Sequence, residues 1–93
     1  MFYLITYDII NDKRRTKLST LLEKYGTRVN YSVFECELTQ RKLDKLLAEI
    51  ELKKLLHKEH DSLRFYHVCK NCAPKCFEVT NRLDPFESEE MYI

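Results

Sequence analysis

The chain has 93 residues, of which 44% are hydrophobic, 12% aromatic and 33% charged, and its net charge is +1. This length favours a single domain with a modest core, and this composition excludes a disordered chain. The charge excludes a polycation, but its distribution is uneven. Residues 1–48 carry nine Lys/Arg and six Asp/Glu, whereas residues 49–93 carry seven and nine. A nucleic-acid partner would therefore bind only through a local basic patch.

The sequence also indicates a compartment. It contains no run of 18 apolar residues, so no transmembrane helix and no membrane partner are expected. The N-terminus lacks the charged region and cleavage site of a signal peptide, which predicts a cytoplasmic protein. In the cytoplasm the four cysteines are expected to be reduced.

The chain begins with a predicted strand over residues 2–9, FYLITYDI, which is rich in aromatic and β-branched residues. Both faces of this strand are largely apolar, so both faces of its sheet should be covered. Asn11 or Asp12 can cap a helix over about residues 13–25, where apolar residues recur at helical spacing. Gly26 is the expected C-terminal cap of this helix, in the left-handed conformation.

The remaining elements are predicted in the same way. Residues 28–38 predict a strand, or two strand pieces if the chain bends or bulges near Ser32. Residues 40–57 predict a second helix. Two further strands are expected, at residues 62–69 and, briefly, at residues 77–80.

With residues 28–38 divided in two, the order of elements becomes βαββαβ, which is that of a ferredoxin-like fold. We predict an α+β sandwich over residues 1–80, with two helices on one face of an antiparallel sheet. A second copy of the chain, in a two-fold dimer, would cover the other apolar face. Residues 81–93 are predicted to form an acidic tail whose apolar end could add a strand to the partner's sheet.

A cationic run at residues 13–15 follows the carboxylate that ends the first predicted strand, Asp8. Cations at a helix start oppose the helix dipole, which is a reason to expect an anionic partner there. Arginine forks match phosphate oxygens, and an ordinary solvated basic face is the alternative. The candidate nucleic-acid-binding residues are Arg14, Arg15, Lys17 and Arg28.

Asp8 is a candidate metal ligand. Mg²⁺ takes one or two carboxylates, with waters and phosphates in the other positions, and Mn²⁺ is an alternative. One chain supplies only Asp8, with Asp12 as a neighbour, so the site becomes plausible only where a two-fold dimer brings a second Asp8. Alternatively, Asp8 caps the strand end or pairs with Arg15. No histidine lies near Asp8 in the sequence to act as a base, so rapid turnover is not predicted.

Three of the four cysteines are close in sequence. Cys69, Cys72 and Cys76 have the spacing C-x2-C-x3-C, with His67 nearby. A structural zinc site usually has two paired motifs, whereas this chain has one. We therefore do not expect zinc and interpret these residues as reduced thiols.

Three segments, LITYDI, DKRRTKL and YGTRVNYSVFE, together resemble the small CRISPR-associated adaptation proteins of the Cas2 family. The resemblance runs from about Phe2 to Leu38 and continues more loosely through LRFYHVC. It departs from the family at Asn30, where glutamine is more usual, and in the last dozen residues. The resemblance implies a ferredoxin-like homodimer that supports spacer integration beside the integrase Cas1.

The same resemblance implies residue roles. Family members are described as metal-dependent nucleases, and the strand-ending aspartate, here Asp8, is their proposed metal ligand. Tyr7 and Arg15 would belong to the same catalytic site. Further motif positions are matched by Arg28, Ser32 and Phe34.

We therefore expect a CRISPR adaptation protein that binds spacer-precursor duplex DNA, with single-stranded RNA as a further candidate. A magnesium-dependent endoribonuclease or endonuclease activity is expected with it. Two alternatives stay open. One is a purely structural DNA-binding scaffold without catalysis, and the other is a ferredoxin-like messenger ribonuclease toxin.

Overall fold

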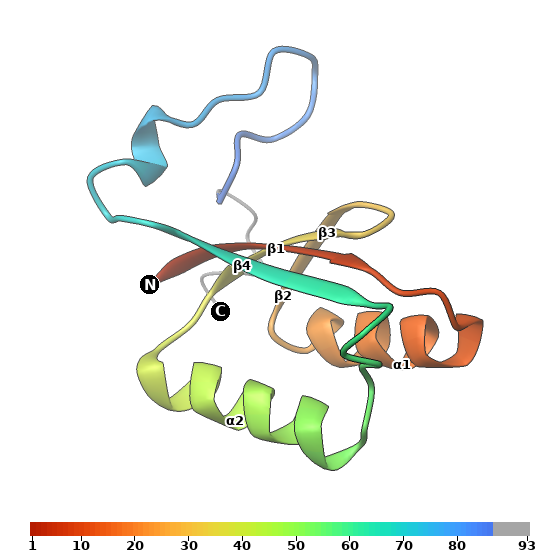
Figure 1. Ribbon diagram of the computed structural model, residues 1–93. Coiled ribbons are helices and arrows are strands. Elements are labelled where there is room, and N and C mark those ends of the chain that lie inside the picture. The colour runs from red at the N-terminus through yellow and green to blue at the C-terminus, as the bar shows by residue number, and fades with distance from the viewer. Residues whose placement is uncertain (87–93) are drawn as a thin grey trace.

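Four strands and two helices follow in the order βαββαβ along residues 1–86, the part of the chain that the computed structural model describes (Figure 1). The sheet has the order β2-β3-β1-β4, and all three strand pairs are antiparallel. This order confirms the predicted ferredoxin-like fold. The elements are β1 (Phe2–Asp8), α1 (Asp12–Glu23), β2 (Gly26–Asn30), β3 (Val33–Glu37), α2 (Gln40–Leu52), β4 (Ser62–Val68) and the 3₁₀ turn η1 (Ala73–Lys75).

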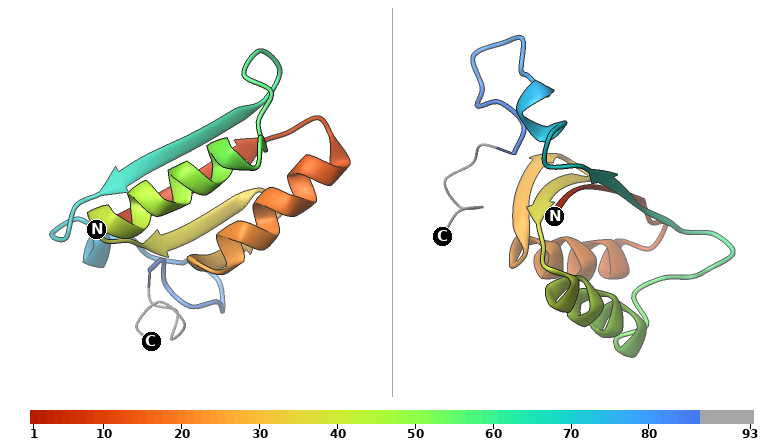
Figure 2. Two further views of the ribbon diagram at one scale, coloured as in Figure 1. Left: turned by 90° about the horizontal axis from the view of Figure 1, so that it is seen from below. Right: turned by 90° about the vertical axis from the view of Figure 1, so that its left-hand side faces the viewer.

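Both helices begin at a side-chain cap and lie side by side on one face of the sheet (Figure 2). The Asn11 side chain accepts a hydrogen bond from the Arg14 N–H at 3.0 Å, and Thr39 accepts one from the Lys42 N–H at 3.2 Å. Each bond satisfies a backbone donor that the first helical turn leaves without a partner. Among residues 1–86, neither helix has the length and apolar content that crossing a bilayer requires.

The core fills the space between the sheet and the helices. In the register of the sheet, Ile5 on the central strand β1 lies opposite Phe34 of β3 and Phe65 of β4. Apolar side chains from both helices pack against this row. The largest side chains that are completely buried are Phe34, Ile5, Leu18, Leu22, Leu38, Leu46, Leu55 and Cys36.

Residues 28–38 contain two strands, as the predicted bend near Ser32 requires. The turn lies between β2 and β3, and a bulge between Arg28 and Asn30 shifts their register.

The prediction of a strand at residues 77–80 is wrong. There the backbone N–H groups of Glu78 and Thr80 bond to side-chain carboxylates at 2.8 Å and 2.6 Å instead of to a neighbouring strand.

The predicted second helix is too long, because α2 ends at Leu52 and not at residue 57. Lys54 adopts a φ of 52°, which reverses the chain after the helix. This reversal returns Leu55 to the core, where it is only 1% exposed. Burial of one leucine is worth about 2 kcal/mol, enough to offset a left-handed residue.

The segment that follows β4 passes over the sheet face opposite the helices (Figure 1). Its Phe86 is buried, lies 5.3 Å from the ring of Phe2 and donates its N–H to Glu35 at 3.1 Å. Burial raises the pKa of the Glu35 carboxyl, and the Phe86 N–H opposes this shift. The predicted domain boundary at residue 80 and the strand added by the tail stay predictions, since residues 87–93 lie outside the described residues.

Gly26 does not cap α1 in the left-handed conformation, because its φ is not positive and it is the first residue of β2. Lys24 closes the helix instead, donating its N–H to the carbonyls of Leu21 and Leu22. Glycine is needed at position 26 for a different reason. A Cβ atom there would lie 2.3 Å from both the Cys36 sulfur and the Glu35 carbonyl oxygen.

We expect Gly26→Ala to lower the free energy of unfolding by about 1–3 kcal/mol, because β2 must move away from β3 to admit the methyl group. Urea unfolding monitored by circular dichroism would measure the loss. Lys45→Ala is the control, since Lys45 is exposed on helix α2. Equal stability of Gly26→Ala and the wild type would contradict this account of the close approach.

Candidate functional site at the end of strand β1

Asp8 is the last residue of the central strand β1 and pairs with Ser62 of β4. Side chains alternate across a strand, and Ile5 and Tyr7 point into the core. The exposed Asp8 side chain therefore lies on the sheet face opposite the helices. Among residues 1–86 it has no hydrogen-bond or ion-pair partner, so this carboxylate is available to a ligand.

Arg15 does not pair with Asp8. Its guanidinium donates to the Ile9 carbonyl at 2.9 Å and forms an ion pair with Asp12, three residues earlier in the same helix. Arg15 thus fastens the start of α1 to the backbone that immediately follows Asp8. Nearly half of its side chain, 46%, stays exposed and can still meet a phosphate.

Arg14 is held by a residue that the sequence did not indicate, Asp61. The Asp61 carboxylate accepts from the Arg14 guanidinium at 2.8 Å and from the N–H groups of His57 at 2.8 Å and Ile10 at 3.1 Å. Its side chain is 1% exposed. The His57 N–H, with Ile10 and Arg14, holds the pKa of Asp61 at about 2. Arg14 therefore has a structural partner, which leaves it less free for a phosphate than Arg15.

Four of the motif residues meet on the other side of β1, around the β2–β3 turn. The Tyr7 hydroxyl donates to the Tyr31 carbonyl at 3.0 Å and accepts from the Arg28 guanidinium at 3.2 Å. That guanidinium lies 5.4 Å from the centroid of the Phe34 ring, within cation–π range. The Tyr7 N–H bonds to the Ser32 carbonyl at 3.1 Å. The structure brings these residues together around the β2–β3 turn, but it does not bring the Tyr7 hydroxyl to the face that carries Asp8.

Two histidines approach the start of α1, although they are far from it in sequence. The bonds that the Ile10 N–H and the Arg14 guanidinium donate to Asp61 hold this connection against the start of α1. The rings of His57 and His60 stack with centroids 4.5 Å apart. A hollow of about 490 Å³ is lined by Ile10, Asn11, Asp12, Arg14, His57 and His60. Sequence reasoning missed this pair because only the tertiary fold brings residues 57–61 beside residue 10.

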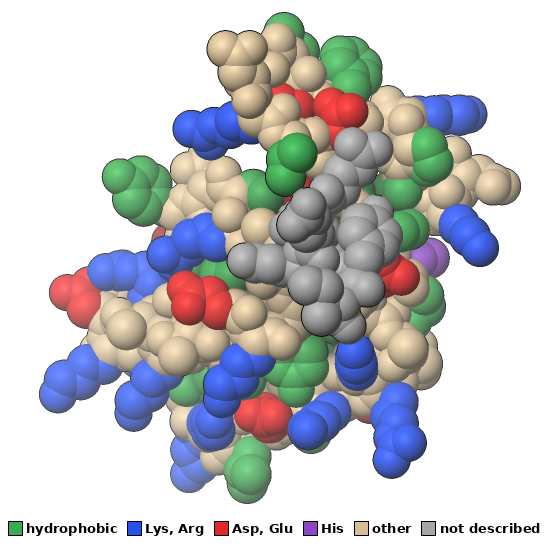
Figure 3. Space-filling view, turned by 180° about the vertical axis from the view of Figure 1, so that it is seen from behind, with side chains coloured by type: hydrophobic (Ala, Val, Ile, Leu, Met, Phe, Trp, Pro, Cys, Tyr) green, Lys and Arg blue, Asp and Glu red, His purple; other side chains and the backbone are tan. Residues whose placement is uncertain are grey.

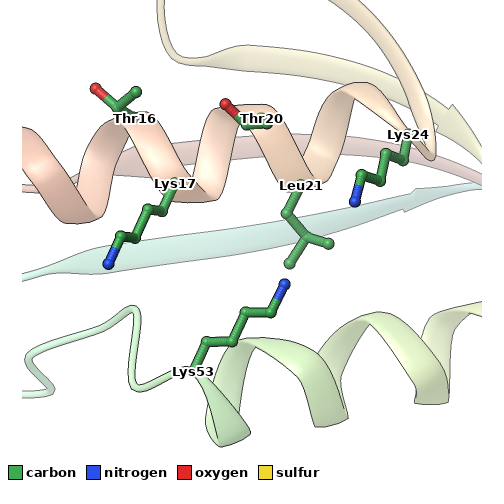
Figure 4. Close-up of a pocket in the computed structure, with 6 residues that line it drawn as sticks. All are labelled: Thr16, Lys17, Thr20, Leu21, Lys24 and Lys53. Atoms are coloured by element: carbon green, nitrogen blue, oxygen red, sulfur yellow. The ribbon is translucent and has the colours of Figure 1, made fainter.

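Lys17 belongs to a different basic region, on the helical layer. Lys and Arg side chains gather over the lower half of the molecule as seen from behind (Figure 3). Lys17 and Lys24 of the α1 side and Lys53 after α2 project into the space between the helices, around Leu21 (Figure 4). We call this hollow of about 510 Å³, lined also by Thr16 and Thr20, the lysine groove. Of the three lysines of this groove, only Lys53 has a carboxylate partner among the described residues, which is Glu49 at 3.5 Å.

The described part of one chain does not assemble a metal centre by itself. Among residues 1–86, no group of three or more His, Cys, Asp or Glu side chains has the geometry to hold a metal ion. Asp8 could still supply one carboxylate to a site that a second molecule completes. Mg²⁺ fits such a site chemically, because it binds through one or two carboxylates and keeps several waters.

The sheet order and the two helices on one face define a ferredoxin-like α+β protein with an exposed carboxylate at the end of its central strand. The chain belongs to the family described as CRISPR associated protein Cas2, whose model matches residues 1–76. This membership confirms the resemblance seen in the sequence. It also favours a CRISPR protein over the messenger ribonuclease toxin that the sequence left open.

Curated relatives and solved structures agree with the family. The chain is 39% identical over 100 residues to CRISPR-associated endoribonuclease Cas2 1 of Chloroflexus aurantiacus, covering 100% of this chain and 99% of the relative. It is 30% identical to Streptococcus pyogenes Cas2 in a crystal structure at pH 6.5, with a TM-score of 0.70, covering 86% of this chain and 100% of that one. It is 32% identical to a chain of a partial Cas6-RT-Cas1–Cas2 complex, with a TM-score of 0.68 and coverage of 94% and 91%.

We expect Asp61→Asn to lower stability at neutral pH and to flatten its decline in acid. A carboxyl whose pKa falls from 3.8 to about 2 on folding stabilises the native state above pH 4, and this contribution is lost as the pH falls toward 2. Urea unfolding at intervals between pH 7 and the acid limit would measure both effects. Asp44→Asn is the control, since Asp44 is exposed and accepts only from Gln40. Parallel stability curves for wild type and Asp61→Asn would contradict the assignment.

Proposed function

We propose that this protein is a CRISPR adaptation protein that binds spacer-precursor duplex DNA as a two-fold dimer beside the integrase Cas1. We further propose that Asp8 serves a Mg²⁺-dependent phosphodiesterase activity on RNA or DNA, with Mn²⁺ as an alternative ion. The observation that carries the catalytic proposal is the exposed Asp8 carboxylate, which has no partner among residues 1–86. Relatives named endoribonuclease and endonuclease, and the complex named for Cas1 and Cas2, support the two halves of the proposal.

We propose the dimer because a metal site at Asp8 requires a second carboxylate. Among residues 1–86, one chain offers a single carboxylate, Asp8, at the end of β1, and two copies related by a two-fold axis would bring two Asp8 side chains to one site. Two facing carboxylates repel each other, so a divalent cation between them would be bound favourably. Waters and the scissile phosphate would fill the remaining positions of the ion and bring the phosphodiester bond within reach of an activated water.

Exposed apolar residues supply a surface for the second copy. The side chains of β2, β4 and the segment after β4 include large apolar groups that lie in water in the single chain. Such surface is costly unless another molecule covers it. The residues are Val29 at 38% exposure, Tyr66 at 46%, Leu83 at 70%, Phe77 at 73% and Val79 at 84%.

Duplex DNA would be held through its phosphates. Lys17 and Lys24 have no carboxylate partner among residues 1–86, and both project into the lysine groove. Arg15 is half-exposed near the end of β1, whereas Arg14 is engaged by Asp61. Phosphate contacts position a duplex without reading its sequence, which suits a protein that must accept any incoming fragment.

Asp8→Ala is expected to abolish metal-dependent cleavage, because it removes the carboxylate that would hold the ion. The assay uses labelled single-stranded RNA and duplex DNA, each with Mg²⁺, with Mn²⁺ and with EDTA. Asp44→Ala is the matched control, an exposed aspartate of helix α2.

The possible results of this assay separate the two alternatives. Loss of cleavage in Asp8→Ala alone would support a hydrolytic site at Asp8. If neither wild type nor variant cuts, or both cut equally, the catalytic proposal fails. Salt-sensitive duplex binding by both proteins would then leave the purely structural scaffold as the function.

The double variant Lys17→Gln, Lys24→Gln is expected to weaken duplex binding equally for unrelated sequences. For each phosphate that a lysine no longer neutralises, the slope of log K against log salt should become shallower by about 0.9. Fluorescence anisotropy at several salt concentrations would measure the slope. Lys75→Gln is the control, since Lys75 is exposed in η1, away from the helical layer. An unchanged slope in the double variant would remove the lysine groove from the DNA-binding surface.

A further inference from the structure

A pair of exposed cysteines sits in the turn that follows β4. Cys69 comes immediately after the strand, and the N–H groups of Cys72 and Ala73 both bond to its carbonyl at 2.9 Å. These bonds close a tight turn that holds the two residues close together, and the short helix η1 continues from it. Both cysteines are free thiols on the surface, and the proposed DNA binding and catalysis use neither of them.

The two thiols of this turn have different acidities. The Cys72 thiol, followed by the backbone N–H groups of the turn, lowers the pKa of Cys69. The same thiol contact and the negative charge of Cys69 raise the pKa of Cys72. The thiolate is the reactive form of cysteine, so one member of the pair is suited to attack while the other keeps its proton.

The other two cysteines lack this combination. Cys36 is completely buried, and burial, with the nearby charge of Glu35, raises its pKa to about 12. Cys76 is half-buried, and its thiol points to the Cys72 carbonyl at 3.7 Å. Among residues 1–86, no group of three or more metal-ligating side chains forms around these thiols.

We propose that Cys69 and Cys72 form a dithiol site that exchanges with small-molecule disulfides. The Cys69 thiolate attacks one sulfur of the disulfide, a new S–S bond forms, and the first small thiolate leaves and takes up a proton. Cys72 then gives up its proton and attacks the Cys69 sulfur of the mixed disulfide, which expels the second small thiolate. Two protein thiols are oxidised to one disulfide, and one small disulfide is reduced to two thiols.

This chemistry has a structural consequence. The turn joins β4 to the segment that covers the open sheet face and ends, within the described residues, at the buried Phe86. A disulfide between residues 69 and 72 would add a covalent constraint to this connection, which the backbone hydrogen bonds of the turn hold in the dithiol form. The proposal does not depend on the nuclease activity and can be tested without it.

The experiment equilibrates the full chain, in parallel without and with EDTA, with glutathione buffers of increasing oxidised fraction. Intact mass and peptide mapping would locate the products. We expect loss of two hydrogen atoms through a Cys69–Cys72 disulfide in the wild type and in Cys76→Ser, and no such product in Cys69→Ser or Cys72→Ser. Brief alkylation of the reduced protein should label Cys69 at least about tenfold faster than Cys36.

Circular dichroism melting of each variant shows whether it folds, so that a misfolded protein is not mistaken for an unreactive one. The proposal is overturned if the folded wild type forms no Cys69–Cys72 disulfide, or if the disulfide joins Cys76 instead. It is also overturned if the thiols react only after a chelator removes a bound metal, because the cluster would then be a metal site.

Discussion

The Asp61 carboxylate is the interaction on which the surroundings of the candidate site depend. It accepts hydrogen bonds from the backbone of Ile10, the backbone of His57 and the guanidinium of Arg14. One buried charge thus joins the loop after β1 to the connection before β4. A buried carboxylate is stable only when its hydrogen bonds are satisfied, and here the two loops supply two donors and helix α1 supplies the third, Arg14. The loop that follows Asp8 is therefore held by a residue 51 positions away from Ile10.

The alternation of side chains along β1 separates two sets of residues that are neighbours in sequence. Tyr7 points into the core and, with Arg28 and Phe34, holds the β2–β3 turn. Asp8 points to the opposite face and has no such partner among residues 1–86. Adjacent residues of one motif therefore have different roles. Tyr7 stabilises the scaffold, and Asp8 is left for the proposed chemistry.

The sheet face that carries Asp8 is also the face that other parts of the protein approach. The segment after β4 crosses it and buries Phe86 against Phe2 and Glu35. The same segment starts at the cysteine turn, so the proposed dithiol site and the covered sheet face are connected through one stretch of backbone. A second copy of the chain would meet this segment as well as the sheet, which makes the conformation of the segment relevant to the proposed dimer.

The sequence by itself determined the fold class and the helix starts, because these follow from local periodicity and from caps such as Asn11 and Thr39. It also identified Asp8 as the carboxylate that ends β1. It could not place Gly26, whose role is a close approach to β3, or exclude a strand at residues 77–80, where carboxylates take the backbone donors. Nor could it find Asp61 or the histidine pair. Such contacts join residues far apart along the chain, so only the tertiary structure, in which packing brings them together, decided them.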